Sequence, residues 1–210
     1  MFSFLSGTSK NNRFFADALG IFEENADIVT LATQIFDTAW NDYRQKASEK
    51  NKIKEGLYLC KMFCGGSHFL RRRFFASPPY FDNKYGYEEM PPSLMAFDAK
   101  KLNALACDLL AIHKPRVNKW DRTDEKNHAL LINECAVPYA IKKMMYPAVF
   151  APLLWLAYCK RVKKHLSGVP EGKKKSDILV HETVKKNRIS SRIRASTVIR
   201  MYREFGVSIF

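Results

Sequence analysis

The sequence lacks the local motifs that identify common enzyme classes. It contains no G-x-S-x-G, no H-E-x-x-H and no paired-carboxylate motif, and the stretch Gly65-Gly66-Ser67-His68 lacks the lysine of a phosphate-binding loop. The 5 histidines lie far apart in the chain, and His113 falls on a predicted apolar helix face, where a core or helix-terminal role is expected. We therefore expect a protein with no catalytic site, no cofactor and no small-molecule substrate.

A disulfide pattern is also missing. The 5 cysteines are odd in number and scattered through the chain, whereas a secreted disulfide-rich domain normally has a denser, even set. We therefore expect a reducing intracellular compartment, and the N-terminal residues lack the basic segment and apolar run of a secretory signal.

Cys60, Cys64 and His68 are spaced by four, as zinc ligands on one helix face would be. A structural zinc site needs a fourth ligand, so we predict no metal site.

Acidic residues are scarce toward the C-terminal end. The 210-residue chain has a formal charge of +14, and residues 151–210 contain fourteen Lys and Arg but only four Asp and Glu. Such a concentration of charge predicts a polyanionic partner, which could be nucleic acid, an anionic membrane surface or an acidic protein face. The candidate polyanion-binding residues are Arg71, Arg72, Arg73, Lys173, Lys174, Lys175, Arg188, Arg192, Arg200 and Arg203.

Sustained alternation of polar and apolar residues, the pattern of a half-buried strand, is nearly absent. Apolar residues instead recur at spacings of three and four, most clearly over 28–43 and 98–113, which is typical of amphipathic helices. We therefore predict an all-α fold, an irregular helical bundle. Residues 1–113 are expected to form a helical domain with a long proline-rich and aromatic loop at 77–93. Residues 114–167 are expected to hold a long apolar helix, and residues 168–210 a basic arm with an amphipathic helix.

No apolar run reaches the usual length of a membrane span, but one comes near it. Residues 144–159 carry no charge and are flanked by lysines. As a helix they would extend about 24 Å, short of the ~30 Å hydrocarbon core of a bilayer. Two interpretations remain open, a buried central helix of a soluble bundle and a membrane-embedded helix with basic flanks. The candidate membrane-embedded residues are Met144, Tyr146, Phe150, Leu153, Leu154, Trp155, Leu156 and Tyr158.

Two functional hypotheses follow from these patterns. The first is a non-catalytic accessory or structural subunit of a larger multi-protein assembly, associated with a membrane such as the mitochondrial inner membrane. This subunit would contact other protein subunits and anionic lipid. The second is a nucleic-acid-binding protein of the cytoplasm or a virion, either ribosome-associated or part of viral or phage packaging. In that case the basic residues would neutralise phosphates, and added salt would weaken binding steeply.

Overall fold

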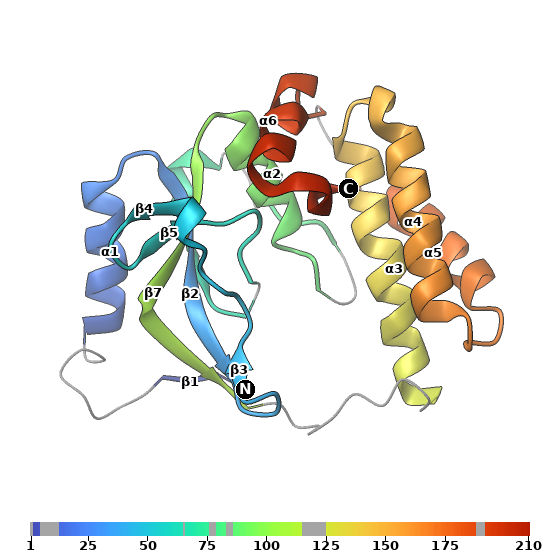
Figure 1. The fold of residues 1–210 in the computed structure, drawn as a ribbon, viewed down its shortest axis with the longest axis horizontal. Coiled ribbons are helices and arrows are strands. Elements are labelled where there is room, and N and C mark those ends of the chain that lie inside the picture. The colour runs from blue at the N-terminus through green and yellow to red at the C-terminus, as the bar shows by residue number, and fades with distance from the viewer. Residues whose placement is uncertain are drawn as a thin grey trace. The chain divides into compact units, whose positions relative to one another are not determined.

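The computed structural model describes residues 2–4, 13–64, 66–75, 79–82, 86–114, 125–187 and 192–210. The chain divides into two compact units. The sheet unit comprises Met1–Pro79 and Met95–Lys119, and the helical unit comprises Tyr80–Leu94 and Trp120–Phe210. Figure 1 shows the strands of the first and the long helices of the second. The predicted all-α fold is therefore wrong, because the chain is mixed α/β.

The sheet unit contains a mixed sheet built on two long strands. In the described residues, β2 (Ile28–Asp37) and β7 (Leu102–His113) are parallel neighbours, and every other strand pair is antiparallel. The main path through the sheet runs in the order β3-β2-β7-β5-β4, with β1 beside β7 and β6 beside β2. The short strands are β1 (Phe2–Phe4), β3 (Asp42–Tyr43), β4 (Lys52–Lys54), β5 (Leu57–Leu59) and β6 (His68–Leu70).

Both faces of the β2–β7 pair are covered. On one face, α1 (Phe14–Glu24) packs Phe22 and other buried residues against Leu31 of β2. Ala32, the next residue of β2, belongs to a second cluster that includes Leu105 of β7 and Phe63. Phe14, Ala18 and Phe22 form the side of α1 that contacts the sheet, whereas Phe15 and Leu19 are exposed.

This double burial explains why the apolar spacing of the two central strands resembles that of helices. Every residue of β2 except Phe36 is buried, so the strand has no polar side and no alternating pattern. A parallel strand covered on both faces has a nearly continuous apolar sequence, and such a sequence also fills positions three and four residues apart. Asp98, expected to cap a helix over 98–113, is instead the last residue of α2 (Met90–Asp98), and β7 follows it.

The proline-rich loop predicted at 77–93 gives way to helix α2 before its end. Pro91 and Pro92 lie in the first turn of α2, where a helix needs no amide hydrogen bond and where proline is tolerated. The boundary between the two units falls within α2. Residues 77–78 and 83–85 of the expected loop lie outside the described part of the chain.

The helical unit is organised around α3 (Glu125–Met145), which packs against α4 (Ala151–Leu166) and α5 (Gly172–Lys186) (Figure 1). Short connections join the three helices, which run alternately up and down in the view. Their shared core consists of small and branched residues around one buried tyrosine. Its members are Leu131, Ile132, Cys135, Ala136 and Ala140 of α3, Tyr158, Val162 and Leu166 of α4, Val169, and Val180 of α5.

The apolar run 144–159 is not one helix. α3 ends at Met145, Pro147 interrupts the chain, and a 3-10 turn, η4 (Ala148–Phe150), leads into α4. Within the described residues, no helix is both long and apolar enough to cross a membrane. This finding contradicts the predicted membrane-embedded helix and the predicted membrane association. Of the candidate residues, Met144, Tyr146, Leu154 and Tyr158 are buried in the protein, Phe150 is half-buried, and Leu153, Trp155 and Leu156 are exposed.

The predicted basic amphipathic helix near the C-terminus is present as α6 (Ala195–Phe205). Val198 and Met201 are buried, while Arg200 and Arg203 are exposed, as the sequence pattern predicted. Tyr202 is also exposed, although the apolar side of an amphipathic helix would be expected to bury an aromatic ring. The 3-10 turn η5 (Gly206–Ile209) follows, and the Ile209 carbonyl oxygen accepts a hydrogen bond of 2.8 Å from the buried Tyr146 hydroxyl.

The sheet core gives a direct test of this fold. Leu31→Ala should lower the free energy of unfolding by about 2–5 kcal/mol, because Leu31 is fully buried between β2 and α1. The matched change Leu19→Ala on α1 should alter it by less than about 0.5 kcal/mol, because Leu19 is 58% exposed. Urea unfolding followed by circular dichroism measures both. Equal effects of the two changes would contradict the described position of β2.

Candidate functional site

A buried polar network lies at the carboxyl ends of the central strands β2 and β7. Asp37 is the last residue of β2 and His113 the last residue of β7, and the parallel register pairs them directly. Arg44 follows the short strand β3, which turns back along β2. In open α/β sheets the carboxyl ends of parallel strands are a common place for ligands, so this edge is a candidate site.

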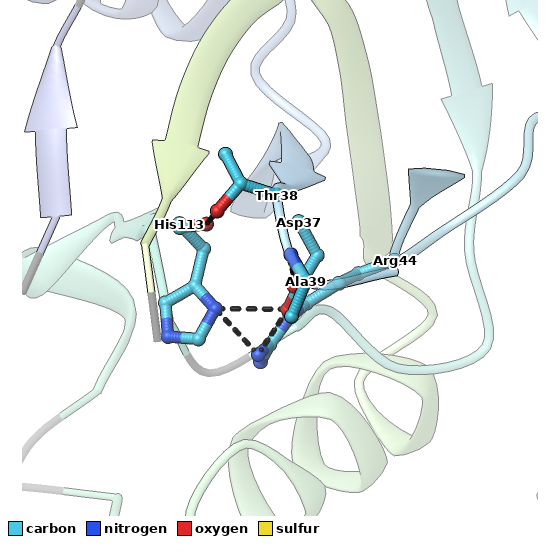
Figure 2. A network of polar contacts seen from close by, with 5 residues as sticks. All are labelled: Asp37, Thr38, Ala39, Arg44 and His113. Atoms are coloured by element: carbon cyan, nitrogen blue, oxygen red, sulfur yellow. Dashed lines mark hydrogen bonds and ion pairs between the residues drawn. The ribbon is translucent and has the colours of Figure 1, made fainter. Parts of the chain in front are cut away.

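The three side chains meet at a single carboxylate oxygen (Figure 2). Oδ2 of Asp37 accepts hydrogen bonds from Nε and Nη2 of Arg44 at 2.9 and 2.7 Å. Nδ1 of His113 lies 2.9 Å from the same oxygen and 2.7 Å from Nη2 of Arg44. The other oxygen of Asp37 accepts the Ala39 amide at 3.0 Å. The hydroxyl of Thr38 donates to the His113 carbonyl oxygen at 3.2 Å, so the chain after β2 is also tied to the end of β7.

These contacts keep Asp37 ionised although it is only 1% exposed. Burial by itself would raise the pKa of Asp37, but hydrogen bonds from Arg44, His113 and Ala39 together lower it to about 2. The network therefore holds a buried charge that is matched by an adjacent guanidinium. It fastens the ends of β2 and β7 to the chain after β3, and we assign it a structural role.

Little in the sequence pointed to this network. His113 was expected on a helix, where it would be a core or terminal residue, but it ends a strand and contacts a buried carboxylate. Asp37 and Arg44 belong to no motif that would single them out. Asp37 and His113 are 76 positions apart, so only knowledge that both segments are paired strands would have joined them.

The Cys60, Cys64 and His68 spacing does not make a metal site in the described residues. No group of three or more His, Cys, Asp or Glu side chains there is placed to hold a metal ion. Cys60 follows strand β5 and is buried, and burial raises the pKa of its thiol to about 12. His68 begins strand β6, and its ring lies 4.4 Å from the ring of Phe63. The expected helical face is therefore absent at this position.

The predicted polyanion-binding arginines of the sheet unit divide into two kinds. The Arg71 guanidinium donates to three main-chain carbonyl oxygens between Phe22 and Ile28 and lies over the Phe22 ring at 5.0 Å. It therefore stabilises the connection between α1 and β2. Arg72 and Arg73 are exposed.

In the helical unit, the predicted lysines gather with others at one end of the α4–α5 hairpin. Three lie in the last turns of α4 and three in the first turn of α5, with residues 167–171 between the helices. All six are exposed. We call this group the lysine cluster, and its members are Lys160, Lys163, Lys164, Lys173, Lys174 and Lys175.

Only two members of the lysine cluster have an acidic partner within the described residues. Lys173 pairs with Asp177 at 2.6 Å, and Lys174 pairs with Glu171 at 3.4 Å. Elsewhere in the helical unit, Arg192 is exposed, as are the α6 arginines at positions 200 and 203, while Arg188 lies outside the described residues. The lysine cluster therefore joins three predicted polyanion-binding residues, Lys173, Lys174 and Lys175, to three exposed lysines of α4 that were not predicted.

Two hollows lie beside the lysine cluster, and both are lined in part by Asp177 and His181 of α5. The larger is an open groove of about 900 Å³ with an apolar floor and with Lys173 and Lys174 on its wall. The smaller has a volume of about 290 Å³ and is bordered by Trp155. We call them the lysine groove and the aromatic hollow.

The Asp37 network makes a stability prediction. Asp37→Asn should lower the free energy of unfolding at neutral pH by about 2–3 kcal/mol, because it removes a buried charge whose pKa the network lowers to about 2. Asp42→Asn is the matched control, since Asp42 is exposed, pairs with Lys46 and accepts the Tyr43 amide, which Asn can still do, and it should leave stability nearly unchanged. Chemical denaturation of the two variants and the wild type is the measurement.

The pH dependence follows from the direction in which the Asp37 pKa moves. A carboxyl whose folded pKa is lowered stabilises the fold above its ordinary pKa of 3.8, and this contribution disappears as the pH falls toward about 2. The difference between wild type and Asp37→Asn should therefore be full at neutral pH and shrink toward pH 2. A difference that persists unchanged to pH 2 would show that the loss does not come from the Asp37 charge.

Comparison with known proteins supplies no family. No protein-family model matches the chain, and no curated protein matches its sequence. The function must therefore be inferred from the chain's own side chains.

Proposed function

We propose that the protein is a non-catalytic component of a larger assembly that binds nucleic acid through its helical unit. The observation that carries this proposal is the lysine cluster at one end of the α4–α5 hairpin. Nucleic-acid backbones are bound mainly through contacts between phosphates and Lys or Arg side chains. Six exposed lysines on two adjoining helix ends provide such contacts within a small area.

The two ion pairs within the cluster do not compete strongly with phosphate. The side chains of Lys173 and Lys174 are 61% and 70% exposed, and so are large parts of their partners. Exposed ion pairs of this kind contribute little to stability, because water and salt screen them. Both lysines can therefore exchange an acidic side chain for a phosphate at small cost.

The position of the lysines on α5 also supports an anionic partner. The first turn of α5 contains three lysines and no acidic residue, and the one carboxylate at its N-cap, Glu171, pairs with Lys174. A helix N-terminus carries partial positive charge, so lysines there are repelled, whereas lysines in the last turn of α4 are favoured. A phosphate near the start of α5 would offset that repulsion.

This proposal predicts that affinity depends on the lysine cluster. Changing Lys163, Lys164 and Lys175 together to Gln should weaken binding of a single-stranded oligonucleotide of about 16 nucleotides. It should also reduce the slope of log affinity against log salt by about 0.7 for each phosphate that the variant no longer neutralises. Fluorescence anisotropy between about 50 and 200 mM salt measures both quantities.

The control variant removes the same number of positive charges, but from the sheet unit. Lys50, Lys100 and Lys114 are exposed lysines of the sheet unit, and their joint change to Gln should leave affinity and slope near the wild-type values. Equal weakening by both sets would mean that only total charge matters and would contradict the assigned surface. Absence of any binding by the wild type would contradict the function itself.

A second feature supports the assembly part of the proposal. The outward face of the chain around α4 carries Val149, Leu153 and Leu156, which are 72%, 47% and 63% exposed. This surface fits the apolar face of a partner helix.

Size measurement tests this protein contact separately. In extracts treated with nuclease, the wild-type chain should elute from gel filtration in a complex larger than the monomer. The double change Leu153→Gln and Leu156→Gln should shift it toward the monomer, because it removes the exposed apolar side chains. Leu19→Gln, at an exposed leucine of the sheet unit, is the control. A wild-type monomer after nuclease treatment would contradict the subunit role while leaving nucleic-acid binding open to its own test.

A further inference from the structure

The aromatic hollow lies on the surface of the helical unit where three helices meet. Its lining comes from Tyr139 and Lys143 of α3, Trp155 of α4, and Asp177, Val180 and His181 of α5. The volume of about 290 Å³ is near the lower limit of small-molecule sites, which is suitable for one planar ring system. The hollow is therefore sized for a fragment of a ligand.

The aromatic rings at this hollow are held in place by their neighbours. Tyr139 stacks on the buried Tyr158 with ring centroids 4.4 Å apart and an angle of 15° between the planes. The Tyr158 hydroxyl donates to Asp177 at 2.7 Å, which ties α4 to α5. Trp155 lies 6.5 Å from Tyr139 and is 45% exposed. A ring held by such neighbours can stack a ligand ring without first losing much conformational freedom.

The charges around the hollow favour a ring in it and a phosphate outside it. Burial opposes the charge of Asp177, but hydrogen bonds from Lys173 and Tyr158 lower its pKa, so the lining includes a carboxylate that repels phosphate. Lys173, which lies 6.0 Å above the Trp155 ring, also lines the neighbouring lysine groove. Asp177 lines both hollows, and Glu171 and Glu182 also line the lysine groove, so the interior of the groove repels phosphate as well. A phosphate would be attracted to the exposed lysines of the lysine cluster beside the two hollows.

We propose that the aromatic hollow binds one unpaired nucleobase, stacked on Trp155, while the adjoining phosphates contact the exposed lysines of the lysine cluster. The proposal rests on the nucleic-acid binding proposed above and makes it specific for single strands. In a duplex the bases are stacked on each other and inaccessible, whereas single-stranded sites commonly combine a basic groove with aromatic side chains. Stacking on an aromatic ring tolerates any base, so no sequence preference is required.

The test compares Trp155→Ala with Trp155→Phe, which keeps a stacking ring. The probes are a fluorescently labelled oligouridine of about 16 nucleotides and a duplex of the same length. Trp155→Ala should weaken binding of the single strand by about 5- to 100-fold, whereas Trp155→Phe should stay within a few-fold of wild type. Binding of the duplex, which uses lysines alone, should be the same for all three proteins.

Two further measurements separate base stacking from general charge effects. Trp40→Ala, at the exposed tryptophan of the sheet unit, should not change affinity, and circular dichroism should show α4 intact in Trp155→Ala. The single strand should quench tryptophan fluorescence in the wild type and much less in Trp155→Phe, even if Trp155→Ala fails to fold. Unchanged affinity and unchanged quenching, together with weakening by the lysine changes, would overturn the base site but leave nucleic-acid binding standing. No binding of either probe by the wild type would overturn both.

Discussion

The parallel pairing of β2 with β7 is the constraint on which the sheet unit depends. Two parallel neighbours cannot be joined by a tight turn, so a long connection lies between them, and part of it forms β3 to β6 around the pair. The pair is covered on both faces, by α1 on one side and by the segment containing Phe63 on the other. The same register places Asp37 opposite His113. A carboxylate buried at that position must find cations and amide donors, and the hairpin that brings Arg44 back along β2 supplies one of them.

Double burial also limits what could be predicted from the sequence. The amphipathic helix α6 was found because it has one apolar and one polar side, and that asymmetry is visible in a short window. The strands β2 and β7 have no such asymmetry, and their identity depends on a partner more than sixty residues away in the chain. The lysine cluster was partly predicted, because Lys173, Lys174 and Lys175 are adjacent in the sequence. The Asp37 network could not be predicted, because His113 is 69 positions from Arg44 and 76 from Asp37, and Asp37 and Arg44, seven positions apart, match no motif.

The apolar run 144–159 shows a related limit. Its average hydrophobicity suggested a membrane segment, but the average does not show that its apolar side chains face two different sides. Leu154 and Tyr158 face the core with α3, whereas Leu153 and Leu156 face outward, and Pro147 separates α4 from α3. Trp155 was predicted to lie in a membrane for the same reason, because it belongs to a run whose average hydrophobicity is high. Its ring is half-exposed beside Tyr139 and Lys173, a setting that hydrophobicity alone does not describe.

The two kinds of contact in the proposed site would respond differently to conditions. Lysine–phosphate contacts weaken with salt because binding releases counterions, and each exposed pair contributes little. Stacking on Trp155 depends on dispersion and on removal of apolar surface from water, so salt affects it far less. Residual affinity for single strands at high salt would then come from the aromatic hollow. The Tyr158–Asp177 hydrogen bond supports both kinds of contact, because it holds α4 against α5. It thereby fixes the hollow next to the lysine groove.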